Sequence, residues 1–432
     1  MKPFQLVVVA IFGFLALAGL YVFANFTGGS GGSSIGTVLI WGVLPQAAMQ
    51  AAIADEAKTN TAYKNVTYVE KDPATLNDDL AQAIATGKGP DLVLASQDLL
   101  LPLANKLAVI PYASLPQRTF LNTYEGVFGI YLTQTGTYGV PLVVDPMVLY
   151  YDKTLLQDAG VAAPPSAWEQ FAGLVPLLTK QTNAQSIQQS TIPFGGYGNV
   201  EHAASILSLL ILQAGSPVTM MSASGGMRSA LVPAGGSAQT APATAAVRFY
   251  TQFADAAKSV YSWNPSLPNS RQFFLAGNLA FYPGFASEVP SLSAANPNLH
   301  FDMAPIPQAA AGGVKADYAL AYAFMFPSAS KNPSGAFTVA EALSASASMS
   351  AIAKATHTAP ASTALLAPDP ADPYQAVFYP EALIAKAWLS PSSATTDAIF
   401  AAMINDVTSG RETADNALIS AGLSLDAALK NL

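Results

Sequence analysis

Short apolar runs alternate with stretches of helical periodicity over the first part of the globular sequence. Strand-like runs occur at residues 37–41, 66–69 and 92–95, whereas segments 46–58 and 76–86 carry apolar residues at helical spacing. Strands that are separated by helices predict right-handed βαβ units and a parallel sheet. The pattern therefore indicates the α/β fold class.

Two candidate ligand contacts follow from this predicted sheet. Ligands of open parallel sheets bind outside the carboxyl ends of the strands. Trp41 ends the first predicted strand, and Asp98 follows the third. Packing and helix capping are the competing roles, because a tryptophan could close the sheet and an aspartate is a common N-cap.

A third candidate lies in residues 138–171, the segment around which the rest of the sequence is arranged. The β-branched, aromatic run 143–151 predicts a strand that Asp145–Pro146 breaks, since proline cannot donate to a strand ladder. A carboxylate inside such a run needs a partner or water, which makes Asp145 a ligand candidate.

Two helix starts are also predicted in this segment. Asp152 stands at the N-cap position of a short helix, and Ser166, with Glu169 three residues later, predicts a capping box for the next one. Further along the chain, strands are predicted at 279–282, 301–306 and 318–326.

The N-terminal residues have the composition of a membrane segment. Residues 4–24 are uncharged and would rise about 31 Å as a helix, enough to cross the hydrocarbon core. This length favours a retained anchor over a cleaved signal, whose apolar region is shorter. Residues 1–27 are therefore predicted as the anchor or signal, and the Gly/Ser-rich residues 28–36 as a tether. With Lys2 inside, the remainder faces the extracytoplasmic side.

Composition excludes several kinds of site. Net charge is −8 with a pI near 4.8, and no basic stripe is present, which argues against nucleic-acid binding. Cysteine is absent, so disulfides and thiolate metal sites are excluded. The histidines His202, His300 and His357 are far apart in sequence, so no histidine metal site or cofactor is expected.

Several motifs then occur in an order that resembles one known family, the family 1 extracellular solute-binding proteins, which includes maltose-binding protein. The segment 138–171 is similar to that family's hinge-crossing segment YGVP, LYYNK, AG, PP. The other matching stretches are IATGKGPD at 84–91, FLAGNLAF at 274–281, PSASKNP at 327–333 and INDVTSGRETADNAL at 404–418.

This resemblance implies a two-lobed periplasmic-binding-protein fold with a ligand cleft between the lobes. The first lobe would hold residues 37–146 with about 322–372, and the second 147–321 with about 373–432. The chain would be a monomer that captures a sugar or oligosaccharide by hinge closure and delivers it to the permease subunits of an ABC importer.

By position in the family, the cleft residues can be assigned. Trp41, Asp98 and Asp145 match first-lobe positions, and Tyr197 and Phe285 match aromatic platforms of the second lobe. Tyr282 and Tyr322 are added from their places at predicted strand ends. The usual Asn of LYYNK is Asp152 here, and the platform tryptophan is Phe285, so the chemistry fits a sugar without being specific for maltose.

Three alternatives remain open from the residues. A carboxylate beside aromatic faces suits sugar hydroxyls and ring faces, but acids with aromatics also suit a polyamine. A carbohydrate-active enzyme would need paired carboxylates, which Asp98 and Asp145 could imitate. A purely structural surface protein would need neither a hinge nor strand-end acids.

Overall fold

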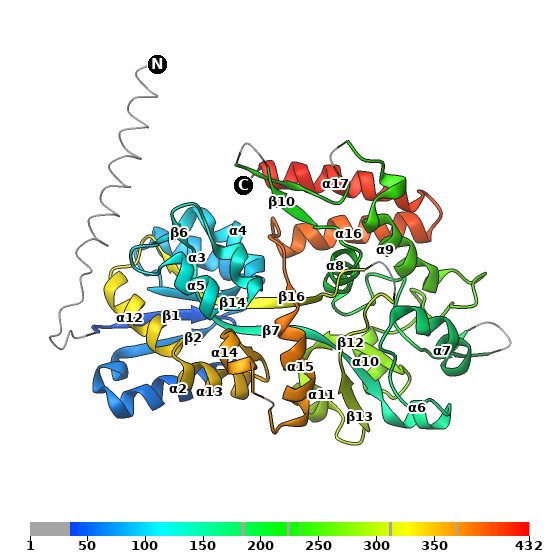
Figure 1. The fold of residues 1–432 in the computed structure, drawn as a ribbon, viewed down its shortest axis with the longest axis horizontal. Coiled ribbons are helices and arrows are strands. Elements are labelled where there is room, and N and C mark those ends of the chain that lie inside the picture. The colour runs from blue at the N-terminus through cyan, green and yellow to red at the C-terminus, as the bar shows by residue number, and fades with distance from the viewer. Residues whose placement is uncertain are drawn as a thin grey trace, which may run out of the picture.

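The computed structural model describes residues 35–431 except 183–185, 223–224, 234, 311–312 and 369. The predicted parallel sheet lies at one end of the molecule (Figure 1). Strand β1 (Val38–Gly42) pairs in parallel with β2 (Val66–Glu70) and with β3 (Leu92–Ser96). Helices α2 (Gln46–Thr59) and α3 (Leu76–Ala85) connect these strands, which confirms the predicted βαβ units and the α/β class.

Later parts of the chain complete this first lobe. Strand β14 (Asp317–Pro327) pairs antiparallel with β3, and β7 (Gly139–Asp152) pairs antiparallel with β14, giving the order β2-β1-β3-β14-β7. Helices α12 (Pro333–Leu343) and α13 (Ser346–Thr356) lie beside α2. The short elements here are α4 (Leu100–Leu103), α5 (Gln117–Thr123), α14 (Thr363–Leu366), β4 (Leu107–Ala108), β5 (Ile110–Pro111), β6 (Gly136–Thr137), β15 (Ala359–Pro360) and the 3-10 turns η1 (Thr61–Asn65), η2 (Gln97–Leu99), η3 (Ala104–Lys106) and η4 (Gly126–Tyr131).

Both faces of this sheet are covered, which explains the continuous apolar runs of its strands. Leu92 and Leu94 pack in one apolar cluster, whereas Val93 and Ala95 pack in another on the opposite face. Because successive side chains of a strand point to opposite faces, a strand covered on both sides must be apolar throughout.

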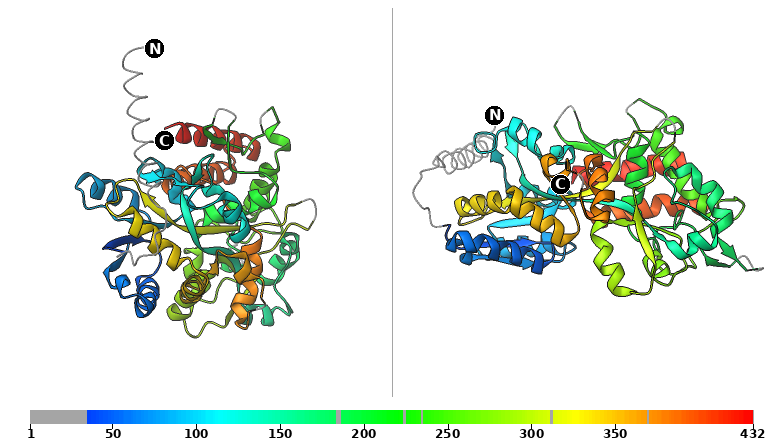
Figure 2. Two further views of the ribbon diagram at one scale, coloured as in Figure 1. Left: turned by 60° about the vertical axis from the view of Figure 1, so that its left-hand side comes forward. Right: turned by 60° about the horizontal axis from the view of Figure 1, so that its bottom comes forward.

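Strands β7 and β14 run from the first lobe into the second and form the junction between them (Figures 1 and 2). The first half of β7 pairs with β14, and its second half pairs with β12 (Phe281–Phe285) and β13 (Phe301–Ala304). Helix α15 (Pro373–Leu383) lies against β7 at this junction.

The second lobe is mainly helical around these strand ends. Its helices are α6 (Lys153–Asp158), α7 (Phe171–Leu178), α8 (Ala203–Gln213), α9 (Pro242–Thr251), α10 (Ser270–Leu275), α11 (Val289–Ala295), α16 (Ser393–Thr408) and α17 (Ala414–Lys430). Its other elements are β8 (Lys180–Gln181), β9 (Ile187–Gln189), β10 (Thr219–Met221), β11 (Met227–Ser229), β16 (Ala385–Lys386), and the 3-10 turns η5 (Trp168–Gln170), η6 (Ala238–Thr240), η7 (Gln252–Ala254) and η8 (Ala286–Glu288).

The structure corrects the expectation that Asp145–Pro146 breaks a strand. β7 is continuous from Gly139 to Asp152. Pro146 stands opposite Ala319 as the last residue of β7 that pairs with β14, and the next residue, Met147, pairs with β12. A residue without a backbone N–H is tolerated where one ladder ends and another begins.

Of the two predicted helix starts, one is confirmed and one is wrong. The Asp152 side chain accepts hydrogen bonds from the backbone N–H groups of Thr154 (2.8 Å) and Leu155 (3.1 Å), as an N-cap should. Ser166 does not cap; instead the side chain of Gln170 accepts from the N–H groups of Ser166 and Ala167. The predicted partner, Glu169, accepts from Ala310.

The predicted membrane segment at 4–24 lies outside the described residues. The same holds for the predicted tether at 28–36, except for its last two residues. Within the part of the chain that the structure describes, no single helix has both the length and the apolar character to cross a membrane. Helices α12 and α13 meet that test only as a pair, and the pair is bent by 72°.

Candidate ligand-binding cleft

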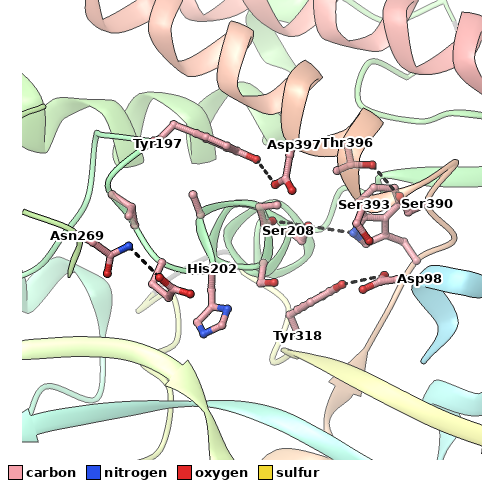
Figure 3. A pocket seen from close by; sticks show the side chains of 17 residues that line it. Asp98, Tyr197, His202, Ser208, Asn269, Tyr318, Ser390, Ser393, Thr396 and Asp397 are labelled. Carbon is pink, nitrogen blue, oxygen red and sulfur yellow. Dashed lines mark hydrogen bonds between the residues drawn. The ribbon is translucent and has the colours of Figure 1, made fainter. Parts of the chain in front are cut away.

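A cavity of about 350 Å³ lies where the two lobes meet (Figure 3). Asp98 reaches it from the first lobe, Tyr318 reaches it from β14, and the second lobe supplies the rest of the wall. Larger depressions, of about 720 and 670 Å³, are each lined by a single lobe, around α2 and β2 or around α9 and α16. The cavity between the lobes differs from these two depressions because residues of both lobes line it.

The first-lobe wall is a short turn that is fastened to β14. Gln97 is fully buried directly after β3; its side-chain oxygen accepts from the N–H of Ala321 at 2.7 Å. The other end of its amide donates to Oδ1 of Asp98 at 3.2 Å, and the hydroxyl of Tyr318 donates to the same oxygen at 3.4 Å. Burial raises the pKa of Asp98 to about 6, with a further increase from the negative charge of Asp397.

The second-lobe wall consists largely of the beginnings of two helices. Helix α8 is viewed almost end-on in Figure 3, and the residues before and within its first turn line the cavity. Its N-cap, His202, has a left-handed backbone with φ 57° and makes no capping hydrogen bond through its side chain. The first N–H groups of a helix have no partner within the helix, so they suit a ligand oxygen.

Helix α16 provides the other helix start. Ser392 caps it by accepting from the N–H of Thr395, while Ser393, Thr396 and Asp397 line the cavity. The segment just before α16 adds Trp388 and Ser390 to the wall. Trp388 is buried, with its indole N–H donating to Ser208 of α8 at 2.9 Å, which ties the two helices together.

Two carboxylates of this wall are each held by one neutral donor. The Tyr197 hydroxyl donates to Oδ1 of Asp397 at 2.7 Å, and the Asn269 amide donates to Oε2 of Glu201 at 2.8 Å. Burial, together with the Asp397 carboxylate, raises the pKa of Tyr197, so its hydroxyl keeps its proton. Among the described residues, no donor is found for the second oxygen of either acid. These oxygens are available to a ligand.

His202 is oriented from behind by Glu288. The ring Nε2 lies 2.9 Å from Oε1 of Glu288, which also accepts from the N–H of Phe285, while Oε2 accepts from the Tyr282 hydroxyl. Burial alone would lower the pKa of His202, but Glu288 outweighs it and raises the pKa. Gly284 makes room for this contact, because a Cβ there would lie 2.6 Å from Oε1 of Glu288.

The structure brings two of the sequence-predicted site residues, Asp98 and Tyr197, into the cavity wall. Trp41 and Tyr322, both partly buried in the first-lobe sheet, are not among the lining residues. The Lys71 ammonium lies 4.0 Å from the centre of the Trp41 ring.

The other three predicted residues lie behind the wall. Tyr282 is fully buried in the second-lobe core, stacked on Phe274. Phe285 is 5% exposed and packs edge-on against the His202 ring. Asp145 is 3% exposed, with both oxygens accepting from Ser287, at 3.0 Å from the backbone and 2.6 Å from the hydroxyl. Burial raises the pKa of Asp145 to about 7.

Sequence reasoning missed Glu201, His202, Asn269 and Asp397. It searched the carboxyl ends of strands, whereas these residues stand at or near the start of helices, and Asp397 comes from a part of the chain two hundred residues beyond Tyr197. The available signal was the Ser/Thr-rich start of α16, which marks an N-terminus without saying what it faces.

Several solved structures are similar to this chain. CpMnBP1 with mannotriose bound is 21% identical, with a TM-score of 0.68, covering 90% of this chain and 100% of that one. The cyclic alpha-maltosyl-1,6-maltose binding protein of Arthrobacter globiformis is 15% identical, with a TM-score of 0.73 over 92% and 99% of the two chains. The maltose/maltodextrin-binding domain MalE of Bdellovibrio bacteriovorus, bound to maltotriose, is 15% identical, with a TM-score of 0.67 over 91% and 100%.

At these identities, the likeness establishes the two-lobed fold and nothing finer. No curated protein matches the chain in sequence. The family model for bacterial extracellular solute-binding proteins matches residues 42–349, more than two thirds of the chain. This chain therefore belongs to the bacterial extracellular solute-binding protein family.

Proposed function

We propose that this protein captures a sugar or short oligosaccharide in the cavity between its lobes and delivers it to the permease subunits of an ABC importer. The observation that carries the proposal is the cavity itself, which both lobes line with groups suited to hydroxyls. Asp98, Asp397 and Glu201 offer carboxylate acceptors, and the start of α8 offers backbone donors.

Aromatic rings complete the match to a carbohydrate. Tyr197, Tyr318 and Trp388 line the cavity beside these polar groups, and the apolar C–H faces of a sugar ring pack on aromatic planes. Of the predicted site residues, Asp98 and Tyr197 would contact the ligand directly. Phe285, Tyr282 and Asp145 would act from behind the wall, through His202, Glu288 and Ser287. Trp41 and Tyr322 stay predictions for the first-lobe side.

Ligand capture would close the lobes about β7 and β14. The proposed lobe boundaries near residues 146 and 322 fall within these two strands. Since only a closed form contacts the ligand from both lobes, the ligand would shift the equilibrium toward closure. A smaller radius of gyration by small-angle scattering at saturating ligand is the expected result, and an unchanged radius would contradict closure.

The same proposal keeps residues 4–24 as a single membrane anchor, with the binding lobes outside. What supports it is the uncharged composition and length of this segment, together with the extracellular assignment of the family. Sequencing the N-terminus of protein extracted from membranes tests it, because a chain that starts after residue 24 would mean that the segment is removed.

The enzyme alternative loses its support. Proteins of this family bind solutes and are not enzymes. The two acids that could imitate a hydrolase pair are not together in the cavity, because Asp98 lines it while Asp145 is buried on Ser287. The polyamine alternative is kept as an outcome of the binding experiments.

The variant Asp98→Asn tests the site directly. It removes the first-lobe carboxylate while keeping an oxygen that accepts from Tyr318, so folding should be preserved. A charged hydrogen bond is worth roughly 1.5–3 kcal/mol, so titration calorimetry should show an affinity for the sugar about one to two decades lower. The sugar itself is found by a thermal-shift screen of the purified chain, since a ligand of the folded state raises the melting temperature.

The matched control for this variant is Asp78→Asn, which removes an exposed acid from α3 of the same lobe. It should leave both affinity and melting temperature unchanged. Unchanged affinity in Asp98→Asn together with a lower melting temperature would show that the carboxylate is structural.

A further inference from the structure

The charges around the cavity are strongly one-sided. Three carboxylates line it, those of Asp98, Glu201 and Asp397, and no lysine or arginine is among the described residues of its wall. The single basic group there, His202, is already paired with Glu288 at 2.9 Å. Glu288 also has Arg271 3.5 Å from its Oε2, so this acid already has two basic partners. Among the described residues of the wall, these three carboxylates outnumber the one basic group, His202, whose pKa Glu201 also helps to raise.

Helix capping does not account for these acids. A carboxylate near the start of a helix is often explained by its bonds to the first N–H groups. In α16 that role belongs to Ser392, which accepts from the N–H of Thr395. Asp397 comes five residues after this N-cap, beyond the first turn. Beside α8, the Glu201 carboxylate bonds to Asn269 and no side chain caps the helix. Asp98 follows a strand and is held by Gln97 and Tyr318.

The arrangement of the carboxylates is suited to a cation between the lobes. Asp98 belongs to the first lobe and Asp397 to the second, and both line the cavity; in Figure 3, Asp397 lies above the end-on helix α8 and Asp98 to its lower right. Each has one oxygen fixed by neutral donors, and among the described residues the other oxygen has no donor. Closure about the hinge would bring these like charges together, which is unfavourable unless a positive group lies between them.

From this geometry we infer that the ligand is a cationic sugar, a glycan that carries at least one free amine facing Asp98 and Asp397. The inference rests on the proposed sugar-binding function and narrows its ligand class. In this inference, the carboxylates determine which sugars bind in the cavity. The helix-start donors and aromatic rings bind hydroxyls and ring faces, and the ammonium group bridges the two lobes.

A pair of matched ligands tests the inference on the full-length protein. The β-1,4-linked trisaccharides of glucosamine and of glucose differ only at carbon 2 of each ring, which carries an ammonium group in the first and a hydroxyl in the second. Titration calorimetry at pH 6.5 and low salt should give at least tenfold tighter binding of the glucosamine trisaccharide. That preference should shrink as salt is added, since screening weakens the ion pair. Spermidine serves as the probe for a cation without a sugar ring.

Charge-removing variants locate the effect. The variant Asp397→Asn keeps the oxygen that accepts from Tyr197, and folding should be preserved because Asp397 is exposed on α16. It should reduce the glucosamine-to-glucose preference at least fivefold. The control Asp158→Asn removes an exposed acid from α6 in the same lobe, away from the cavity, and should leave the preference unchanged.

The outcomes separate the inference from the function on which it rests. Equal or tighter binding of the glucose trisaccharide overturns the cationic ligand but leaves sugar binding standing. Spermidine binding without either trisaccharide supports the cationic cavity and overturns the sugar assignment. A preference for glucosamine that survives in Asp397→Asn overturns the placement of the amine against this carboxylate. Binding of none of the three probes overturns the cationic ligand, and the sugar assignment is then decided by the thermal-shift screen.

Discussion

Acids at two places in this protein are largely removed from solvent, but they differ in their partners and in their charge behaviour. Glu288, at the end of η8, accepts from Tyr282 and from the backbone of Phe285 and contacts the bases His202 and Arg271. Burial alone would raise its pKa, but the hydrogen bond and charge of His202 outweigh burial and lower it. Asp317, the first residue of β14, is fully buried, and within the described chain neither of its oxygens accepts a hydrogen bond of normal geometry, although the backbone N–H groups of Tyr318 and Met147 favour its charged form.

Asp317 lies close to a second acid, Glu381 of α15, one of whose oxygens also lacks a partner among the described residues. Burial raises the pKa of Asp317 well above its usual range, and the neighbouring Glu381 raises it further. Burial likewise raises the pKa of Glu381 to about 7, although Lys315 opposes this. The contrast shows that burial does not decide the charge of an acid. Partners do, and here the acid with two basic partners supports the cavity, whereas the pair with unsatisfied oxygens lies beside the lobe junction.

The largest expected effect is the loss of the partnered acid. Glu288→Ala should destabilise the protein by about 3–5 kcal/mol in chemical denaturation, because it leaves His202 and Arg271 without their counter-charge. Glu288→Gln keeps an acceptor for Phe285 and Tyr282 and should cost clearly less. Equal losses in the two variants would mean that the charge of Glu288 contributes nothing to stability, and that its basic partners do not stabilise the folded protein.

Removing an acid from the pair with unsatisfied oxygens should change the free energy of unfolding in the opposite direction. The pKa of Glu381 in the folded protein is raised above its unfolded value, so ionisation is disfavoured in the folded state. Its contribution to stability is therefore complete at low pH and is lost as the pH rises toward about 7. Glu381→Gln should stabilise the protein by about 1–3 kcal/mol at pH 8 and have little effect at pH 4.

Urea denaturation at the two pH values measures this, with the exposed Asp158→Asn as the control that should show no pH-dependent gain. A Glu381→Gln protein that is less stable than the parent at pH 8 would show that the carboxylate is ionised and has a partner after all.

Much of the fold could be predicted from the sequence, because its strands are buried on both faces and read as uninterrupted apolar runs. The strand predicted at 318–326 is observed as β14 at Asp317–Pro327, and the first two predicted helices are present within a residue. Pro146 made the predicted break wrong, since a proline inside a run normally marks a break, and only the pairing shows that one ladder ends there as another begins.

The site was less accessible to prediction. Asp98 could be found because the carboxyl end of a parallel strand is a general ligand position. Asp397 and Glu201 could not, because nothing local distinguishes an acid at a helix start that faces solvent from one that faces a cavity. Asp397 meets Tyr197 only through tertiary packing. Likewise, Asp145 has the local pattern of a ligand contact, but its partner, Ser287, is 142 residues away in the chain.

The smallest expected effect concerns an acid that stands between the two extremes. Asp152 is 3% exposed and accepts from two backbone N–H groups, but it has no cation in hydrogen-bond contact within the described structure. Burial raises its pKa despite those two bonds. At a pH above the unfolded pKa, the ionised Asp152 side chain therefore lowers the free energy of unfolding.

The variant Asp152→Asn keeps the capping oxygen and removes the charge; it should stabilise the protein slightly at pH 8, by less than about 0.5 kcal/mol. Asp152→Ala loses the cap and should destabilise it by about 1 kcal/mol. Paired urea melts of both variants resolve the two signs. If Asp152→Asn were as destabilising as Asp152→Ala, the charge and not the cap would be holding the start of α6, and two backbone donors would suffice to keep a buried carboxylate ionised.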